Sequence, residues 1–475
     1  MADSAALTEV LNESALKHLL RVDHQEDLCF ALWTLSQGIT RRTALLHTLI
    51  LPNDGERRVH GNASFTSEYF TRALGIAIQR RSGLALLHSH VGPGWQGLSH
   101  DDHRAEGSNA PAVQAATALP FVGLTVGTDG SWSARFWDRV GPRLYEPSWA
   151  SAVRIVGQQL QATFHPELAA VPPPGLQLSR SIGVWGREGQ AKIARLTLGI
   201  VGLGSVGSIV CEALARMGVT RLILIDYDRI QIINLDRTLG ADHHDIGRLK
   251  VDVAADNALR GSTAKRLRVD RCASSIVEND GYRAALDCDV IFSCVDRPWA
   301  RRILNHIAFA HLIPVIDGGI LVRVRGEAFI GADWHVRTSG PGRRCLECWK
   351  AFDPSLVGIE RDGLLDDPTY LAQLDKDHIL LRHENVFPFS LHVASLQVLQ
   401  LQALLLGPVH NIGDQNYHAA TGTMDRTEDS GCEDHCPYPG LTATSDTVVY
   451  PGGKDIGAAK VRENLHRHEP EVFLK

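Results

Sequence analysis

The sequence predicts an α/β protein built from two domains, an α+β domain over residues 1–165 and a domain with a mainly parallel sheet over residues 179–475. The first observation is length, because 475 residues exceed what one ordinary hydrophobic core accommodates. The second is a run of three prolines at 172–174, which excludes helix and marks residues 166–178 as a linker. The third is the alternation of strand-like and helix-like segments after this linker, which is typical of a parallel sheet with covering helices.

The segments before the linker follow an α+β pattern. Helical spacing of apolar residues predicts helices at 5–20 and 65–81. Short apolar runs predict strands at 27–33, 43–52 and 84–90. Residues 119–137 are expected to form two strands joined by a turn at Gly127–Gly130.

The segments after the linker alternate. Strands are expected at 196–202, 221–226, 289–295 and 313–319, and a helix at 205–218. A polar, Asp-rich stretch around 345–385 predicts a surface excursion. A buried helix is expected at 385–407.

Composition restricts the class of protein. Apolar residues make up 44% and charged residues 21%, as in ordinary soluble globular proteins. A net charge of −6 argues against a general nucleic-acid-binding protein, since no basic field would attract phosphates. The first ten residues lack the pattern of a signal peptide, and Gln397, Gln400 and Gln402 interrupt the longest apolar run, so we expect no membrane span. Nine cysteines are then expected to be thiols and metal ligands in a reducing cytoplasm.

The first chemical motif follows the predicted strand at 84–90. His88 and His90 are two residues apart on a strand and therefore face one side, and Asp102 can complete a set of three metal ligands. Three protein ligands leave a fourth position for water, the arrangement of a catalytic zinc site. Ser99 can donate a hydrogen bond to an oxyanion. The alternative is that Ser99 and Asp102 form a helix capping box and that the histidines are paired by chance.

This motif resembles the zinc site of the JAB/MPN (JAMM) isopeptidases, and the resemblance covers residues 20–140. It implies a catalytic Zn²⁺ on His88, His90 and Asp102, and a glutamate on the first strand as general base. Glu26 is the favoured base and Asp27 the alternative, since only one of two successive strand residues can face the metal. The family has proline after the second histidine, where this chain has Val91.

The second motif is a glycine-rich turn between a predicted strand and a predicted helix. Gly202, Gly204 and Gly207 have the spacing of a turn that presents a helix N-terminus to phosphates. Asp226 ends the next strand, where its carboxylate can bind a ribose hydroxyl. At this point an NAD-dependent dehydrogenase remains equally compatible with the pattern.

The residues that follow distinguish the two, because they supply what ATP chemistry needs. Arg237 and Lys250 offer positive charge to a triphosphate, and Asp296 can hold Mg²⁺. Singly, the two cations could be surface charges and Asp296 a helix cap. In order, the set resembles the ThiF/MoeB/E1 family, on Gly202, Gly204, Gly207, Asp226, Asp228, Asn234, Arg237, Lys250, Asp296 and Arg301.

This resemblance covers residues 179–475 and implies a Rossmann-like fold that binds ATP and adenylates the C-terminus of a carrier protein. It implies a homodimer in which Arg180 reaches the partner's ATP site. It also implies a structural zinc on Cys345, Cys348, Cys432 and Cys436, with free thiols as the alternative. No remaining cysteine is identifiable as the nucleophile of a thioester.

Together, the motifs predict a bifunctional enzyme of a bacterial ubiquitin-like system. One domain would cleave after the carrier's C-terminal glycine, and the other would activate that glycine. An E2-like protein is an expected partner, and a role in antiphage defence is implied by resemblance alone. The alternatives are adenylation of a sulfur carrier for thiamine, molybdopterin or cysteine synthesis, and a non-catalytic scaffold that binds carrier.

Overall fold

The computed structural model describes residues 1–60, 62–326, 328–373, 385–408, 411–448 and 450–464. It divides the chain into two compact units. The first unit comprises Met1–Val171, Phe309–Leu312 and Pro437–Val449, and the second comprises Pro172–Ala308, Ile313–Cys436 and Tyr450–Lys475. The main change from one unit to the other falls after Val171, within the segment expected to be a linker.

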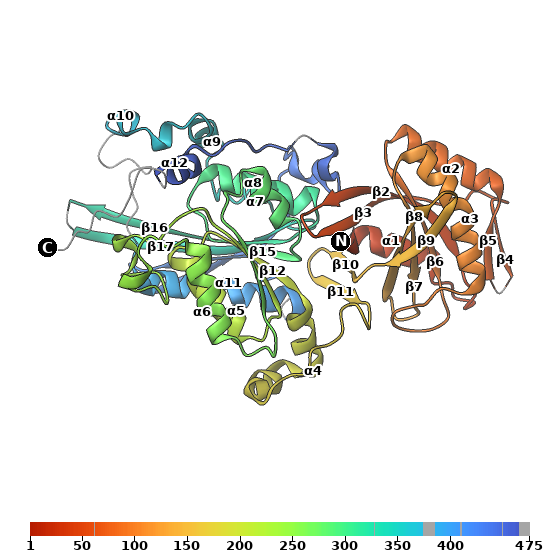
Figure 1. The fold of residues 1–475 in the computed structure, drawn as a ribbon, viewed down its shortest axis with the longest axis horizontal. Coiled ribbons are helices and arrows are strands. Elements are labelled where there is room, and N and C mark those ends of the chain that lie inside the picture. The colour runs from red at the N-terminus through yellow and green to blue at the C-terminus, as the bar shows by residue number, and fades with distance from the viewer. Residues whose placement is uncertain (61, 327, 374–384, 409–410, 449, 465–475) are drawn as a thin grey trace. The chain divides into compact units, whose positions relative to one another are not determined.

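The first unit is built on a nine-stranded mixed sheet with the order β11-β10-β1-β3-β2-β6-β7-β8-β9 (Figure 1). Helix α1 packs against strands in one part of this sheet, and α2 and α3 pack against β6 and its neighbours. Its elements are β1 (Ala2–Thr8), α1 (Glu9–Leu19), β2 (Leu28–Gln37), β3 (Arg41–Ile50), β4 (Arg57–His60), β5 (Asn62–Phe65), α2 (Ser67–Gln79), β6 (Gly83–Ser89), α3 (His100–Thr117), β7 (Phe121–Val126), β8 (Trp132–Gly141), β9 (Leu144–Trp149), β10 (Ala152–Val156) and β11 (Leu160–Phe164).

The predicted helix at 5–20 was wrong over residues 5–8 and right from Glu9 to Leu19. Residues up to Thr8 form β1, which pairs with β3 and β10, and Thr8 then caps α1 by accepting a hydrogen bond from the backbone N–H of Leu11. Apolar residues at 5–7 therefore enter a strand inside the sheet instead of a helix face. Local periodicity could not show this, because their pairing partners lie 39 residues away on β3 and 148 residues away on β10. The predicted strands at 27–33, 43–52 and 84–90 and the hairpin at Gly127–Gly130 are confirmed.

Strand β2 separates two layers of core. Cys29, Ala31 and Trp33 belong to one buried cluster, and Leu28, Phe30 and Leu32 belong to the other, together with residues of α2 and α3. Side chains alternate between the faces of a strand, so even-numbered residues of β2 face the α2/α3 side. Leu84 and Leu86 of β6 belong to the same second cluster.

The second unit is built on an eight-stranded sheet with the order β14-β13-β12-β15-β16-β17-β18-β19. Figure 1 shows α7 and α8 on one face of the sheet and α5, α6 and α11 on the other. Its elements are α4 (Ser179–Arg195), β12 (Thr197–Val201), α5 (Ser205–Arg216), β13 (Arg221–Ile225), α6 (Lys250–Gly261), β14 (Arg268–Cys272), α7 (Asn279–Ala285), β15 (Val290–Ser293), α8 (Pro298–Ala310), β16 (Val315–Arg325), β17 (Ala328–Ser339), α9 (Pro354–Arg361), α10 (Pro368–Leu371), α11 (Phe387–Leu406), β18 (Asp414–His418), β19 (Thr423–Thr427) and α12 (Ile456–Asn464).

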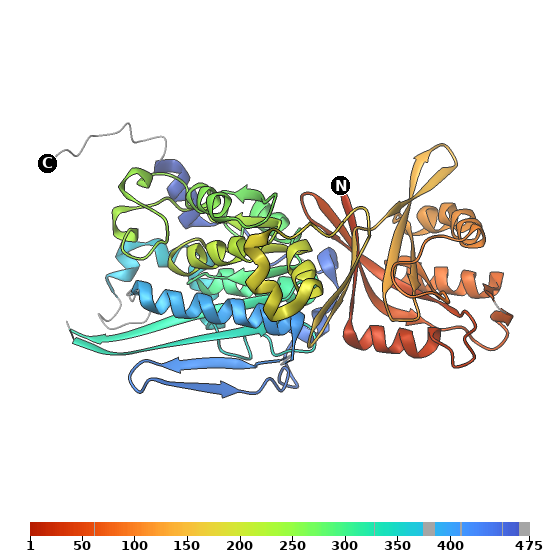
Figure 2. The ribbon, with the colours of Figure 1, turned by 90° about the horizontal axis from the view of Figure 1, so that it is seen from below.

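The first five strands of this sheet are parallel and have the Rossmann order 3-2-1-4-5. The last three are antiparallel, so the sheet is mixed, and the expectation of a mainly parallel sheet missed β17, β18 and β19. Figure 2 shows the β16–β17 hairpin as two long strands with β18 and β19 beside them. In the Rossmann order the sheet's direction of growth reverses between β12 and β15, and ligands bind at the carboxyl ends of strands there.

Helix α11 is long and apolar enough to cross a membrane by length and composition. In this fold it packs against α5, β16 and β17. The buried Gln397 donates to the carbonyl oxygens of Ser293 and Ile316, each at 3.0 Å, and Gln400 donates to that of Gly413 at 2.9 Å. Two of the three amides that interrupt the apolar run thus bond to backbone carbonyls in or next to the strands, which identifies α11 as a core helix of the second unit. The predicted excursion at 345–385 contains α9 and α10, and residues 374–384 lie outside the described residues.

Candidate functional site

The first candidate site brings together three side chains from β6 and α3. Nε2 of His88 lies 3.2 Å from Nε2 of His90, and each lies 3.2 Å from one carboxylate oxygen of Asp102. His88 is at the end of the buried strand β6, His90 follows it, and Asp102 is in the first turn of α3. These three groups offer ligand atoms that lie within 4.8 Å of one another.

The distances fit a tetrahedral metal. Zinc binds imidazole nitrogen and carboxylate oxygen at about 2.0–2.1 Å, so two ligand atoms of a tetrahedral site stand about 3.3 Å apart. The three separations of 3.2 Å agree with that spacing. The donor set of two imidazoles and one carboxylate fits Zn²⁺ and leaves one coordination position for water.

The capping-box interpretation holds at the same residues. The hydroxyl oxygen of Ser99 accepts from the backbone N–H of Asp102 at 3.1 Å, and Oδ2 of Asp102 accepts from that of Ser99 at 3.0 Å. Capping and metal binding are therefore compatible, because a carboxylate has lone pairs enough for both. The cap fixes the direction in which Asp102 presents its carboxylate.

Strand pairing distinguishes Glu26 from Asp27. Leu28 pairs with His88 across β2 and β6, and the backbone N–H of Ser89 donates to the carbonyl oxygen of Asp27 at 3.0 Å. Glu26 is thus opposite His90, and residues opposite each other share a face. Its side chain is half-buried, and burial raises the pKa of the Glu26 carboxyl, against the opposing effect of the two histidines.

Asp27 is buried among cations on the other face. It is 1% exposed and pairs with Arg57 at 2.7 Å and with Arg21 at 3.4 Å. It also accepts from its neighbour, the backbone N–H of Leu28, at 2.8 Å. Both carboxylate oxygens are therefore occupied, so Asp27 anchors the start of β2, and Glu26 is the carboxylate on the face of the histidines.

The electrostatics of the three ligands are coupled. Burial opposes the charge of Asp102, but hydrogen bonds from His88 and His90 hold the pKa of its carboxyl far below the usual range. The hydrogen bond to Asp102 raises the pKa of His90. The carboxylate is thus ionised, as a metal ligand must be.

The second candidate site begins at the glycine turn between β12 and α5. Gly202 has a φ of +87°, and a Cβ there would lie 2.6 Å from the carbonyl oxygen of Cys294. A Cβ at Gly207 would overlap the carbonyl oxygen of Gly202. A Cβ at Gly204 would meet no atom within 4 Å, so this glycine borders open space at the N-terminus of α5. Gly202 and Gly207 are needed for the fold, and Gly204 is where a phosphate can approach the backbone.

Two carboxylates and a lysine adjoin this turn. Asp226 is 9% exposed and accepts from the backbone N–H of Leu203 at 2.6 Å and of Asp228 at 2.7 Å. Lys250 donates from Nζ to Asp228 at 2.9 Å. Burial opposes its charge, but Asp226 and Asp228 raise the pKa of Lys250 overall, with a smaller contribution from Asp296. Lys250 is therefore a cation held next to the glycine turn.

The other predicted residues have different surroundings. Asp296 is exposed between β15 and α8, and Arg180 is exposed in the first turn of α4. Asn234 accepts from the backbone N–H of Gln231 at 3.0 Å, which caps a short turn. Arg237 donates to the carbonyl oxygen of Ile233 at 2.6 Å. Both of these side chains brace their own loop.

Arg301 is bound on three sides. It donates to Oδ1 of the fully buried Asp317 at 3.1 Å, to the carbonyl oxygen of Gly318 at 3.2 Å and to that of Ala351 at 3.3 Å. These contacts join α8 to β16 and to the segment that follows β17. The expected role of Arg301 as an ATP ligand stays a prediction.

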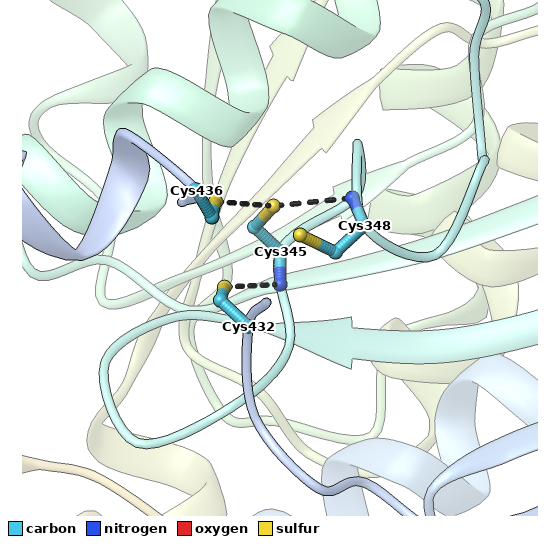
Figure 3. A group of neighbouring side chains, drawn as sticks. All are labelled: Cys345, Cys348, Cys432 and Cys436. Atoms are coloured by element: carbon cyan, nitrogen blue, oxygen red, sulfur yellow. Dashed lines mark hydrogen bonds between the residues drawn. The ribbon is translucent and has the colours of Figure 1, made fainter. Parts of the chain in front are cut away.

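The four predicted cysteine ligands converge in the second unit. Cys345, Cys348, Cys432 and Cys436 offer sulfurs within 4.8 Å of one another (Figure 3). The backbone N–H of Cys348 donates to Sγ of Cys345 at 3.3 Å, and that of Cys345 donates to Sγ of Cys432 at 3.2 Å. A set of four thiolates supported by N–H groups fits a structural Zn²⁺.

Four of the five cysteines outside this set have thiol pKa values that disfavour the thiolate. Burial raises the pKa of the Cys211 thiol to about 12 and that of Cys272 to about 11. Burial also raises the pKa of Cys29 and Cys294. Thiols that stay protonated do not attack carbonyls.

Two groups near these sites had no motif in the sequence. Thr125 of β7 places its hydroxyl oxygen 3.3 Å from Nε2 of His88. Glu360 of α9 accepts from the backbone N–H of Trp299 at 2.7 Å, close to Arg297 and Asp296. A hydroxyl-bearing residue within the otherwise apolar run FVGLTV was the sequence feature that could have indicated a special role for Thr125. Nothing in the order of residues links Glu360 to Trp299.

Residues 178–437 match the ThiF family, which is more than half of the chain. Ubiquitin-like modifier-activating enzyme 5 of Caenorhabditis elegans is 32% identical over 194 residues, 38% of this chain and 44% of the relative. The adenylyltransferase and sulfurtransferase MOCS3 of Caenorhabditis briggsae is 24% identical over 295 residues, 61% of this chain and 66% of the relative. The crystal structure of Escherichia coli MccB with MccA-N7isoAsn has a TM-score of 0.43 and 18% identity, and the alignment covers 56% of this chain and 77% of that one. This chain thus spans less than two thirds of either relative's length.

Proposed function

Because this chain belongs to the ThiF family, we propose that its second unit uses ATP to adenylate the C-terminal carboxylate of a ubiquitin-like or sulfur-carrier protein. The observation that carries the proposal is the placement of the glycine turn, Asp226 and Asp296 after β12, β13 and β15. These three strands are adjacent, so their carboxyl ends meet at one edge of the sheet.

The residues divide the work between binding and charge stabilisation. The backbone at Gly204 and the N-terminus of α5 receive phosphate oxygens, and Lys250 offsets their charge. Mg²⁺ held by Asp296 would supply further neutralisation of the triphosphate. A carboxylate oxygen of the carrier then attacks the α-phosphorus, the bond to pyrophosphate breaks, and a carrier adenylate forms.

The first unit is the candidate peptidase. His88, His90 and Asp102 would hold Zn²⁺, which when bound supplies a Lewis acid that activates water for attack on a carbonyl. Glu26 takes the proton of the attacking water and passes it to the leaving amine. The hydroxyl of Ser99 donates to the carbonyl oxygen on which charge develops. The observation that supports this is the convergence of three ligand atoms with Glu26 on the same face.

The two activities act in sequence in this proposal. Cleavage after the carrier's glycine exposes the carboxylate that adenylation requires. A covalent link between the two units raises the effective concentration of trimmed carrier near the second site.

ATP–pyrophosphate exchange tests the proposal with a mature, Gly-ended carrier and with a precursor that extends beyond the glycine. Wild type should exchange with the first and, after trimming, with the second. The His88→Ala protein should exchange only with the mature carrier, because the extra tail blocks the attacking carboxylate. Absence of exchange with carriers encoded beside this gene would refute the adenylation; rapid exchange of the precursor by His88→Ala would instead assign the first unit to removal of carrier from conjugates.

The acceptor of the adenylate separates two candidate pathways. The raised thiol pKa values of Cys211 and Cys272 favour transfer to a thiol of another protein. An E2-like acceptor is expected in a bacterial conjugation pathway, in which a defence role is the biological context we propose. A sulfurtransferase acceptor is favoured by the relative MOCS3, which carries both activities in its name. Transfer of labelled carrier to one acceptor and not the other decides between them, and a scaffold would transfer to neither.

A homodimer completes the proposal. Arg180 is exposed in the first turn of α4, where its guanidinium can reach a second copy. Arg180→Ala should then bind ATP but adenylate slowly, and mixing it with Asp296→Ala should restore activity at one site of each mixed dimer. If light scattering shows a monomer under conditions in which the protein is fully active, this role of Arg180 is excluded.

A further inference from the structure

The carboxylates of the proposed nucleotide site outnumber the cation that is bonded among them. Asp226, Asp228 and Asp296 act electrostatically on Lys250, and Nζ of Lys250 donates to Asp228 at 2.9 Å. A triphosphate brings further negative charge to this edge of the sheet, and charge grows on the pyrophosphate as it leaves. The site therefore calls for another cation beside Lys250 and Mg²⁺.

Arg297 is a cation on the same loop as Asp296, between β15 and α8. Nη2 of Arg297 donates to Oδ1 of Asp366 at 2.8 Å, in the short helical turn after α9. Nε and Nη1 have no hydrogen-bond partner among the described residues, and the side chain is 33% exposed. The contact with Asp366 therefore fixes the guanidinium and leaves donors available for a ligand. A guanidinium that is held in place in this way loses less conformational freedom when it binds a phosphate.

The surroundings of Arg297 belong to the nucleotide site. Burial opposes its charge, but Asp366 and Asp296 raise the pKa of Arg297 overall. The same guanidinium acts on Tyr227, whose neighbours in the chain are the two carboxylates after β13. Arg297 thus lies within electrostatic reach of the residues after β13 and of the carboxylate after β15.

The order of strands indicates which part of ATP this arginine meets. Strands β13, β12 and β15 are adjacent in this order. The ribose is expected at Asp226, after β13, and the phosphates at the N-terminus of α5, after β12. The far end of the triphosphate then extends toward the loop after β15, where Arg297 lies.

We propose that Arg297 binds the β- and γ-phosphates of ATP through Nε and Nη1, and that Asp366 is the positioning residue that holds its guanidinium. The bonds to the phosphates strengthen as the bond between the α-phosphorus and pyrophosphate breaks and charge collects on the leaving group. The inference rests on the proposed adenylation, because it names a ligand of that ATP.

Calorimetric titration of the full-length protein with ATP and with AMP, each with Mg²⁺, tests this role without turnover. Arg297→Gln should bind ATP about 10- to 100-fold more weakly, because a charge-assisted hydrogen bond to phosphate is lost. AMP lacks both outer phosphates, so its binding should match wild type. Arg302→Gln is the matched control, since it removes an exposed arginine of α8 that has no partner among the described residues, and it should bind both nucleotides as wild type does. Asp366→Asn can still accept from the guanidinium and should weaken ATP binding less than Arg297→Gln does.

The outcomes separate this role from the proposed function. If wild type does not bind ATP, the adenylation proposal itself fails. If wild type binds ATP and Arg297→Gln binds it equally well, only the role of Arg297 is overturned. Equal weakening of ATP and AMP would also overturn it, because Arg297 would then not act on the outer phosphates.

A double variant covers the case in which Arg297→Gln melts below wild type. The protein with both Arg297→Gln and Asp366→Asn has neither charge of the pair, so no carboxylate is left without its cation. It should bind ATP as weakly as Arg297→Gln does. Recovery of ATP affinity in the double variant, or failure of both proteins to fold, would assign the pair a purely structural role and overturn the proposal.

Discussion

The two candidate sites are assembled in different ways. The metal-ligand set of the first unit comes from residues 88–102, on one strand, one loop and the first turn of one helix. The nucleotide site of the second unit draws on residues from Gly202 to Asp296, after three strands of the sheet. In the first, the predicted side chains point at one another; in the second, several bond to their own loops. A short segment thus specifies a ligand set directly, whereas a site spread over a sheet depends on the order of strands.

The largest expected effect concerns Glu26, the proposed general base of the site in the first unit. Glu26→Gln keeps size and removes the proton acceptor, so peptide hydrolysis should fall about 10²- to 10⁴-fold while zinc content is unchanged. Asp27→Asn should lower the melting temperature, since it weakens the pairing of Arg57 and Arg21 with a buried carboxylate, and it should affect turnover less. Zinc analysis, melting and cleavage of a carrier precursor give the three readouts. Equal losses of turnover in the two variants would remove the distinction between the two faces of β2.

The convergence of His88, His90 and Asp102 could be predicted from the sequence, because period-two alternation and helix capping act within a few residues. The sequence left Glu26 and Asp27 open, since facing depends on the pairing of Leu28 with His88. Four of the five parallel strands of the second unit were predictable from apolar segments. Strand β14 was missed because its sequence, RVDRC, is mostly polar. Strands β17, β18 and β19 were missed because they contain polar residues and pair with strands distant in sequence. Asp333 of β17, for example, pairs with His418 of β18. The hydrogen bonds of Arg301 to Gly318 and Ala351 also join residues far apart in sequence. The motif therefore predicted a positive charge at this position but not the groups that it contacts.

Mutations can distinguish the residues of the second unit that act on ATP from those that hold the fold. Asp296→Ala should lower ATP–pyrophosphate exchange at least about 100-fold at an unchanged melting temperature, because it removes an exposed carboxylate that we propose to hold Mg²⁺ at the triphosphate. Arg301→Ala should destabilise the second unit by about 3–5 kcal/mol, because it leaves the buried Asp317 without its cation. Urea unfolding of the full chain and exchange kinetics measure both. An Arg301→Ala protein of wild-type stability that has lost ATP binding would restore it as a direct ligand.

Two glycines of the turn between β12 and α5 should differ in the same way: one is needed for stability and the other for ATP binding. Gly207→Ala places a methyl group on the carbonyl oxygen of Gly202 and should destabilise the second unit by about 1–3 kcal/mol or more. Gly204→Ala meets no atom within 4 Å, so the fold should tolerate it while ATP binding weakens. Melting temperature and calorimetric titration with ATP give the two readouts. If Gly204→Ala binds ATP as wild type does, the phosphates do not approach the backbone at this position.

The last expected effect, which develops only as the pH rises, is a pH dependence of stability at Glu360, near Asp296. Burial raises the pKa of the Glu360 carboxyl to about 7, above its ordinary value of 4.5. Between these two pH values the folded protein holds a proton that the unfolded chain has released. The contribution of this carboxyl to the free energy of unfolding is therefore complete below pH 4.5 and is lost as the pH rises toward 7. The loss should be on the order of 3 kcal/mol at most, from the size of the shift. Glu360→Gln can still accept from the backbone N–H of Trp299, so it should unfold at the same urea concentration as wild type at pH 5 and at a higher one at pH 8.

Glu278→Gln is the control with the opposite sign. Burial opposes the charge of Glu278, but hydrogen bonds from Arg462 and Ser274 lower the pKa of its carboxyl overall. The ionised Glu278 therefore stabilises the fold above its ordinary pKa, and the substitution should destabilise the protein more at pH 8 than at pH 4. Parallel pH profiles for wild type and Glu360→Gln would show that this carboxyl titrates as an exposed one does, and that α9 does not seclude the edge of the site from water.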